Sequence, residues 1–209
     1  MPPSWFRLRP GRPEDVADMC ECFFDGFSNN VPARICFPRT SSQAQAFWYD
    51  SLSEEIQDPN ARFLVVADIS TVPETVIAFA KWNAPLPSDT VYPPLPDNWP
   101  RDGSPEEARA FFEKLAKKHE VIMDKRPHWY LEIIGTKKAY QGKGAGGMLI
   151  RWGTEKADRD GVECYLDASP MGAPIYERYG FKTLETINFF DEKYGYEHAF
   201  MVRDTRNEV

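Results

Sequence analysis

The fold is decided by Tyr140-Gln141-Gly142-Lys143-Gly144-Ala145-Gly146-Gly147-Met148-Leu149-Ile150. Glycines remove Cβ atoms directly before an apolar run with helical character, so a helix should begin inside this stretch. Backbone N–H groups without an acceptor at a helix N-terminus form a ready anion site, and a phosphate is the usual ligand. The same glycines satisfy G-x-G-x-x-G, a pattern that often occurs by chance. Alone, the stretch indicates a phosphate-binding loop without naming the ligand.

A second segment follows downstream: Ala173-Pro174-Ile175-Tyr176-Glu177-Arg178-Tyr179-Gly180-Phe181. Gln141-x-x-Gly144-x-Gly146 resembles the acetyl-CoA signature Q/R-x-x-G-x-G/A of the GCN5-related N-acetyltransferases (GNAT). The second segment is similar to the late A-x-x-Y-E-x-x-G-F motif of that family. Both motifs stand in the family's order, and the chain resembles its small fungal members in particular.

The resemblance implies an α/β fold of the GNAT type, with a central mixed, mostly antiparallel sheet flanked by helices. We expect a single domain over residues 1–209, with a proline-rich loop and a helix inserted at about 84–127, between the third and fourth strands. The implied reaction moves an acetyl group from acetyl-CoA, as co-substrate, to a primary amine. The amine attacks directly in a ternary complex, and no metal takes part.

Composition narrows the possible partners. The net charge of −7 disfavours nucleic acid and favours a cationic acceptor, so the anionic CoA must be held by local groups. No apolar run reaches the roughly 18 residues of a membrane span, and the N-terminal residues lack a signal-peptide pattern. The cysteines are sparse, as is typical of free thiols in a reducing compartment. We therefore expect a cytoplasmic monomer or homodimer that binds neither membrane nor nucleic acid.

Periodicity and turn residues predict alternating strands and helices along the rest of the chain. Strands are predicted at 6–9, 62–69, 75–82, 128–136, 163–168, 181–190 and 198–203, and helices at 13–27, 42–56, 105–123, 144–160 and 172–179. Residues Ser28–Thr40 are predicted as a loop, and Ser104-Pro105-Glu106-Glu107 as a capping box. Gly161 should end the helix that begins at the glycine-rich stretch.

The strand predicted at 128–136 carries the candidate base. Side chains alternate between two faces of a strand, which would put His128, Tyr130, Glu132, Ile134 and Thr136 together and leave the apolar residues on the core face. A carboxylate in an otherwise apolar strand is costly unless it is paired or titrates, and burial raises a carboxyl pKa toward the range of a general base. In similar enzymes a Glu or His at this strand position often takes the amine proton. Glu132 is the predicted base, directly or through water; a structural salt bridge is its alternative, and His128 and Tyr130 are the other candidates.

Tyr176 is the candidate acid. Acyl transfer from a thioester ends with a thiolate leaving group, which a nearby phenol can protonate. In the family that the chain resembles, the tyrosine of the A-x-x-Y motif does this, and Tyr176 occupies that position. The alternative is an ordinary half-buried helix tyrosine. Tyr179 lies three residues on, roughly on the same face, outside the motif's acid position.

Binding of CoA divides between a loop and a strand. Backbone N–H groups from Gly142 to Gly147 should hold the pyrophosphate with help from the helix dipole, and Lys143 adds a charge. Backbone groups of Ile134 and Thr136 should pair with the pantetheine amides, as an added strand would. The predicted cofactor-binding residues are Ile134, Gly135, Thr136, Gln141, Gly142, Lys143, Gly144, Ala145, Gly146 and Gly147.

Two other classes of function fit part of the pattern. Gly142-x-Gly144-x-x-Gly147, with Asp167 about twenty residues on, matches a nicotinamide-dinucleotide fingerprint, but such a fingerprint should follow its strand almost at once. A non-catalytic acyl-CoA-binding module is the second, and the presence of both Glu132 and Tyr176 argues against it.

The acceptor wall is expected from residues 28–40, 85–100 and 189–196. These segments carry aromatic and acidic side chains: Phe37, Tyr92, Trp99, Phe189, Phe190, Asp191, Glu192 and Tyr194. They suit a small amine with an apolar body, while a peptide N-terminus and a polyamine stay open as acceptors.

Overall fold

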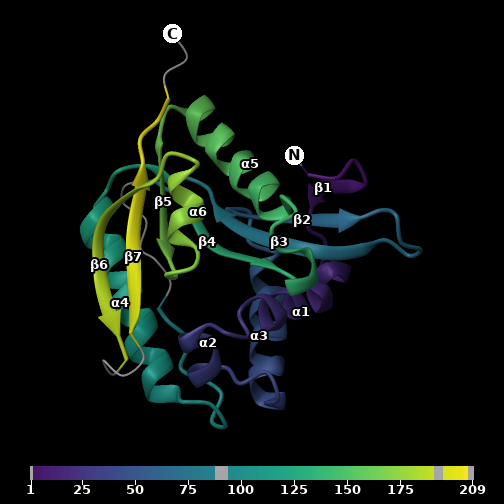
Figure 1. Cartoon of the computed structure of the whole chain (residues 1–209). Coiled ribbons are helices and arrows are strands. Elements are labelled where there is room, and N and C mark those ends of the chain that lie inside the picture. Colours follow the sequence, from purple (N-terminus) through teal and green to yellow (C-terminus); the bar gives the residue numbers. More distant parts are fainter. Residues whose placement is uncertain (1, 88–93, 191–194, 207–209) are drawn as a thin grey trace.

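One seven-stranded sheet organises the chain in the computed structural model, which describes residues 2–87, 94–190 and 195–206 (Figure 1). The strands are β1 (Phe6–Pro10), β2 (Ala61–Asp68), β3 (Thr75–Asn83), β4 (His128–Thr136), β5 (Glu163–Ala168), β6 (Lys182–Phe189) and β7 (Tyr196–Arg203). The helices are α1 (Val16–Gly26), α2 (Val31–Cys36), α3 (Ser42–Glu55), α4 (Pro105–Met123), α5 (Ala145–Asp160) and α6 (Ala173–Glu177). The predicted α/β class, with a helix inserted between the third and fourth strands, is confirmed.

The sheet is mixed, and its one parallel pair lies in the middle. The strand order is β1-β2-β3-β4-β5-β7-β6, and among the described strands only β4 and β5 pair in parallel. That pair is short, because it joins residues 128–131 to residues 163–166 and then ends. In Figure 1, β4 and β5 accordingly run away from each other along their length.

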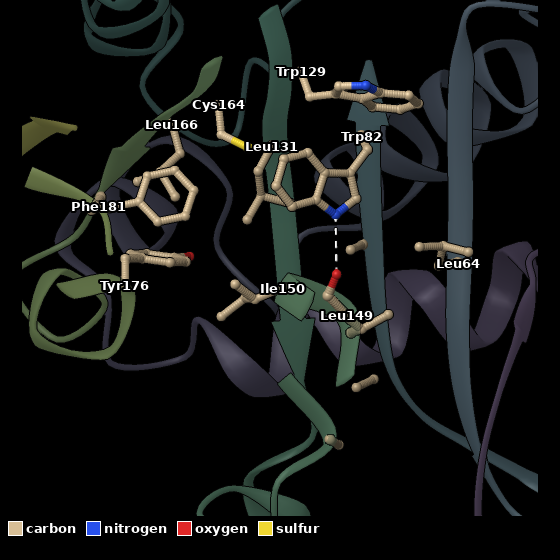
Figure 2. Close-up of a cluster of buried hydrophobic side chains, with 14 of the residues drawn as sticks. Leu64, Trp82, Trp129, Leu131, Leu149, Ile150, Cys164, Leu166, Tyr176 and Phe181 are labelled. Carbon is tan, nitrogen blue, oxygen red and sulfur yellow. Dashed lines mark hydrogen bonds between the residues drawn. The ribbon is translucent and has the colours of Figure 1, made fainter. Parts of the chain in front are cut away.

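Helices cover both faces of the sheet. On one face α5 packs on β2, β3, β4 and β5, and its carbonyl at Leu149 accepts a 3.2 Å hydrogen bond from the buried Trp82 indole (Figure 2). Helices α1 and α3 cover the other face over β3 and β4, and α4 covers it over β5, β6 and β7. Burial of these three apolar clusters supplies the main driving force for the fold.

A β-bulge in β4 changes which side chains share a face. Lys81 of β3 pairs with Ile133, whereas the next residue, Trp82, pairs with Leu131, so Glu132 has no partner of its own across the ladder. Side chains after the bulge are therefore shifted by one position relative to the simple alternation. Ile134 packs in the α5 core with Leu131, and Ile133 packs in the α1 core. The predicted face shared by residues 128, 130, 132, 134 and 136 is wrong for this reason.

Two local predictions also differ from the structure. The segment predicted as a loop at 28–40 contains α2, whose N-terminus is capped by Asn30, since its side chain accepts a 3.1 Å bond from Ala33 N. Six residues are too few to show a helical period in the sequence. Helix α4 begins with Pro105 as expected, but its N-cap Ser104 makes no side-chain cap bond, so the capping box does not form.

Two histidines form a buried pair between α4 and β4. Nδ1 of His128 lies 2.7 Å from the Arg126 carbonyl oxygen, which can only accept, so the ring proton of His128 is on Nδ1. Nε2 of His128 then accepts from Nε2–H of His119 at 2.6 Å. Both rings are neutral in this arrangement. Burial, together with the neighbouring ring, lowers the pKa of His119 to about 3.

This pair predicts a loss of stability in mild acid. The unfolded chain binds a proton to His119 near pH 6.5 whereas the folded chain does not, so stability that is present above that pH decreases as the pH falls. Between pH 7 and pH 5.5 the free energy of unfolding should fall on the order of 1 kcal/mol more in the wild type than in His119→Gln. The glutamine amide still donates to His128 but does not titrate. Urea unfolding at both pH values measures this, and parallel losses would contradict it.

Candidate functional site

The candidate site lies where β4 and β5 separate. Their last paired residues are Leu131 and Leu166, so among the described residues no strand lies on the β5 side of β4 from Glu132 to Thr136. An extended ligand can pair with such an open backbone edge as an added strand. The predicted pantetheine contacts, Ile134 and Thr136, both lie on this open edge.

The glycine-rich loop places the N-terminus of α5 at the same edge. Gly144 is the N-cap residue with a left-handed backbone, φ +94°, which side chains with a Cβ rarely adopt. The first intrahelical bond is donated by Met148 N to Gly144 O, at 3.2 Å. Within the described chain, the N–H groups of Ala145, Gly146 and Gly147 have no backbone acceptor. N–H groups of this kind can bind an anion, which is the role predicted for this loop from the sequence.

The glycines of the loop serve two different purposes. A Cβ on Gly146 would point toward β4, 3.8 Å from Thr136 Oγ1 and 4.0 Å from Ile134 Cδ1, so it would enter the space between α5 and β4. A Cβ on Gly147 would overlap the hydroxyl of Tyr179. The missing Cβ of Gly146 therefore leaves space that a ligand could use. The space that a Cβ of Gly147 would need is already filled by Tyr179.

The polar side chains of the loop tie it to its surroundings. Gln141 Nε2 donates to the carbonyl of Thr136 at 3.1 Å, which fixes the loop to the end of β4. The ammonium of Lys143 lies 5.2 Å from the ring centre of Tyr140. Lys137 is paired with Asp18 of α1 at 3.3 Å, so its positive charge is partly neutralised within the protein.

Tyr176 reaches the site from the α5 side of the sheet. It belongs to α6 and packs in the α5 core, where Figure 2 shows its hydroxyl turned toward Ile150 and away from Phe181. Burial, with a smaller contribution from the negative charge of Asp167, raises the pKa of Tyr176 above its usual value. The phenol is thus protonated at neutral pH and able to donate.

Glu132 lies on the face of the sheet opposite to Tyr176, and it is ion-paired. Its Oε2 lies 2.7 Å from Lys81 Nζ and accepts a 2.6 Å bond from Asn83 Nδ2. Lys81 also contacts Glu55 of α3 at 3.0 Å. Burial would lower the pKa of Lys81, but the two carboxylates together raise it. The cluster thus holds two carboxylates around one ammonium.

The side chains of the other two predicted bases, His128 and Tyr130, are engaged in hydrogen bonds. His128 lies in the paired part of β4, and both of its ring nitrogens are engaged, so it is not at the separation of the strands. The hydroxyl of Tyr130 donates to Asp167 Oδ2 at 3.1 Å.

A hydrogen-bonded chain that sequence analysis missed begins at Asp167, which accepts from Tyr130. Asp167 Oδ1 is 2.8 Å from His198 Nε2, and His198 Nδ1 is 3.1 Å from the hydroxyl of Tyr196. That hydroxyl accepts a 3.1 Å bond from Asn30 Nδ2 at the start of α2. The side chains of Asp167 and His198 are only 9% and 6% exposed. The signal in the sequence was an acid at the end of an apolar strand, which we assigned to a dinucleotide fingerprint.

Four of the residues predicted for the acceptor wall are described, and they pack against other aromatic side chains. Phe37 and Trp99 are buried among other aromatic rings of the α1 core. Phe189 packs against Phe111 of α4, and Phe190 packs beside it. Four predicted wall residues lie outside the described part of the chain: Tyr92, Asp191, Glu192 and Tyr194. A hollow of about 40 Å³ lies between α1 and α2, lined by Phe23, Phe24, Phe27, Ser28, Ala33, Arg34, Phe37 and Arg39.

Residues 2–87, 94–190 and 195–206 contain neither a cluster of metal-ligating side chains nor a helix that could span a membrane. In that part of the chain no three His, Cys, Asp or Glu side chains gather as a metal site would need. None of its helices combines the length and apolarity that crossing a bilayer requires. Its cysteines, Cys20, Cys22, Cys36 and Cys164, are buried free thiols. The mostly antiparallel sheet also lacks the parallel strands of a nicotinamide-binding fold, so that alternative is wrong.

Comparison with known proteins gives concordant results. Residues 29–181 match the model of the acetyltransferase (GNAT) family. A protein of Stachybotrys chartarum named acetyltransferase is 23% identical over 200 residues, which cover 91% of this chain and 86% of that protein. A solved Corynebacterium glutamicum structure, titled histone acetyltransferase HPA2 and related acetyltransferase, superposes with a TM-score of 0.65 at 18% identity, covering 100% of this chain and 99% of that one. The PaiA N-acetyltransferase of Thermoplasma acidophilum, solved with coenzyme A, gives a TM-score of 0.56 at 15% identity over 95% and 98% of the two chains.

Proposed function

Because this chain belongs to the acetyltransferase (GNAT) family, we propose that it transfers an acetyl group from acetyl-CoA to a primary amine by direct attack in a ternary complex. The observation that carries the proposal is the separation of β4 and β5, with the N-terminus of α5 at one side of the opening and Tyr176 beside it. This arrangement provides one site for an anion, one open edge for an extended chain and one buried phenol.

Acetyl-CoA supplies the acetyl group, and the chain's own residues hold it. The N–H groups at the start of α5 would bind the pyrophosphate, with Lys143 nearby as a point charge. The open edge of β4 would pair with the pantetheine amides and bring the thioester to the separation of the strands. Gln141 contributes by holding the end of β4 to the loop.

Tyr176 would act as the acid. When the tetrahedral intermediate collapses, the sulfur takes the electron pair of the C–S bond, and the phenol gives it a proton. Because its pKa is raised by burial, Tyr176 remains protonated until that charge develops. The hydroxyl is needed most in the transition state, where it would stabilise the departing thiolate.

The acceptor binds on the opposite face, beside two carboxylates. Glu132 and Asp167 both lie next to Tyr130, which supports a cationic amine as acceptor. We retain Glu132 as a base, acting directly or through water from the oxygen that Lys81 and Asn83 do not hold. A small amine with an apolar body fits the aromatic side chains of this face.

Replacing Glu132 tests its part in the reaction. Glu132→Gln removes the charge and the basicity but keeps the shape, and it should lower kcat about tenfold at pH 7. Part of that loss should be recovered at pH 9, where more of the amine is already neutral. Steady-state rates at both pH values measure this, with Glu55→Gln, which alters the same ion cluster away from β4, as the matched control. Equal profiles for Glu132→Gln and wild type would make Glu132 a structural carboxylate.

A screen of amines tests the function as a whole. Release of free thiol from acetyl-CoA is followed with a panel of aromatic amines, polyamines and peptides, and acetylated product is identified by mass. A catalytic protein releases thiol in proportion to product with at least one acceptor class. Tight CoA binding without product from any amine would favour the remaining alternative, a non-catalytic acyl-CoA-binding module.

A further inference from the structure

The proposed reaction assigns no catalytic role to the hydrogen-bonded chain of Asp167, His198 and Tyr196. Asp167 is the first residue of β5 beyond its last pair with β4, so its place is the point where the strands separate. His198 and Tyr196 follow on the neighbouring strand β7, on the face that α4 covers. The three side chains come from two strands and converge on one side of the opening.

The partners of these residues fix the direction of each hydrogen bond. Asn30 Oδ1 accepts from Ala33 N at 3.1 Å. The other end of the same amide is therefore Nδ2, which donates to the hydroxyl oxygen of Tyr196. A carboxylate can only accept, so a singly protonated His198 carries its proton on Nε2, toward Asp167, and Nδ1 accepts from the hydroxyl of Tyr196. His198 Nε2 then carries the ring proton and donates to Asp167 Oδ1.

This order of donors matches what a proton acceptor requires. A hydroxyl donates to a neutral imidazole, whose other nitrogen donates to a buried carboxylate. Such a carboxylate orients the ring and stabilises the imidazolium that forms when the ring gains a proton. Tyr130 donates to the second oxygen of Asp167, which holds this carboxyl group in place.

We propose that Tyr196, His198 and Asp167 form a proton-accepting triad for the acceptor amine, so that the ammonium loses its proton to Tyr196 as Tyr196 passes its own proton to His198. An N–H bond of the ammonium breaks and an O–H bond forms on Tyr196. The original O–H bond of Tyr196 breaks and an N–H bond forms at His198 Nδ1. The electron pair of the broken N–H bond stays on the amine nitrogen, which attacks the thioester carbonyl.

The triad rests on the proposed function and changes the part of Glu132 within it. In this proposal Tyr196, which is buried, takes the proton from the amine, whereas His198 and Asp167 act through it as positioning and charge-stabilising residues. Glu132 has one oxygen held by Lys81 and Asn83, so its main contribution becomes its negative charge near the ammonium. The imidazolium returns its proton to water after the product leaves.

The groups around His198 favour this role on every side. The titratable groups that face it are Asp167 from β5, Tyr196 from β7 and, through Asp167, Tyr130 from β4. Helix α4 and strand β6 contribute the rings of Phe111 and Phe189, whose centres lie 5.4 and 5.7 Å from that of His198. The α4 cation Lys114 lies 5.0 Å from the ring centre of Phe189. An imidazolium here would therefore be balanced chiefly by Asp167.

The test compares four variants with an amine that the wild type accepts. His198→Gln keeps a donor for Asp167 but removes the basic nitrogen, and it should lower kcat at least a hundredfold at pH 7. Tyr196→Phe should lower kcat at least tenfold. Asp167→Asn should resemble His198→Gln. Tyr165→Phe is the matched control, because the Tyr165 hydroxyl is buried in the same strand as Asp167 and has no hydrogen-bond partner within the described chain.

A pH profile separates proton transfer from structural damage. For His198→Gln and Tyr196→Phe, kcat should recover at least tenfold between pH 7 and pH 9.5, while KM for acetyl-CoA stays within about twofold and circular dichroism shows an intact fold. Folded variants with wild-type kcat, or with losses that do not recover at high pH, would overturn the triad. A hundredfold loss in Glu132→Gln alone would make Glu132 the sole base. If the wild type releases no thiol with any amine, the proposed function fails first and the triad with it.

Discussion

Tyr176→Phe should lower kcat by about 10² to 10⁴-fold while leaving KM for acetyl-CoA nearly unchanged. The hydroxyl of Tyr176 is needed when the sulfur gains negative charge, so its removal raises the energy of the transition state and not that of the bound substrate. The phenyl ring keeps its packing against Phe181 and the α5 core, so the fold should remain intact. Steady-state kinetics with an accepted amine measure the effect.

Tyr179→Phe is the control for this experiment. Tyr179 lies three residues from Tyr176, but its hydroxyl packs against Gly147 on α5. Loss of that hydroxyl should leave most of the activity. If Tyr179→Phe loses activity and Tyr176→Phe keeps it, the acid is Tyr179 and the motif has been assigned to the wrong residue.

Gly146→Val should weaken CoA binding by ten- to a hundredfold, about 1.4 to 2.7 kcal/mol. The added side chain would point into the space between α5 and β4, where the nearest atoms are 3.8 and 4.0 Å from an ideal Cβ. There is room for its Cβ in the unliganded protein, and Gly146 lies in a helix without a left-handed φ, so we expect the fold to tolerate the change, which circular dichroism checks. The pantetheine or the pyrophosphate would compete with the valine for the same space. Isothermal titration with CoA measures the loss.

Gly144→Val is less suitable for this purpose. Its left-handed φ of +94° would be strained by any branched side chain, so lost affinity could reflect a distorted loop. Gly146→Ala is the graded control: its single methyl group should weaken CoA less than valine does. Unchanged affinity in Gly146→Val, with the fold intact, would contradict the placement of CoA at this loop.

Ion pairing with a lysine distinguishes Glu132 from Asp167, the other carboxylate near Tyr130. Glu132 lies at a bulge, turned toward Lys81, because β4 pairs with β3 in a shifted register there. Asp167 lies on the other strand of the opening, and its oxygens accept from a tyrosine and a histidine. Neither set of partners can be predicted from local sequence patterns. Asp167 and His198 are 31 residues apart, and Glu132 and Asn83 are 49 residues apart.

The sequence by itself determined the class of the fold and the loop at which we propose that the cofactor binds. The glycine-rich loop and the A-x-x-Y motif are local patterns, and the period of apolar residues is a local property of each helix or strand. For this reason β4 and β5 have the predicted bounds, α5 begins within one residue of its predicted start, and Gly161 ends it with a φ of +66°. Membership of the family followed from the same local patterns.

Only the tertiary structure decided which polar side chains meet at the opening. The bulge at Glu132 depends on how β3 and β4 align, and a shift of one residue exchanges the faces of a strand. The contacts of Tyr196 with Asn30 and of His198 with Asp167 join residues on different elements, through pairing of β5 with β7 and packing of α2 beside them. Such contacts arise from strand register and helix packing, which are set by the burial of the whole core and not by the spacing of residues along the chain.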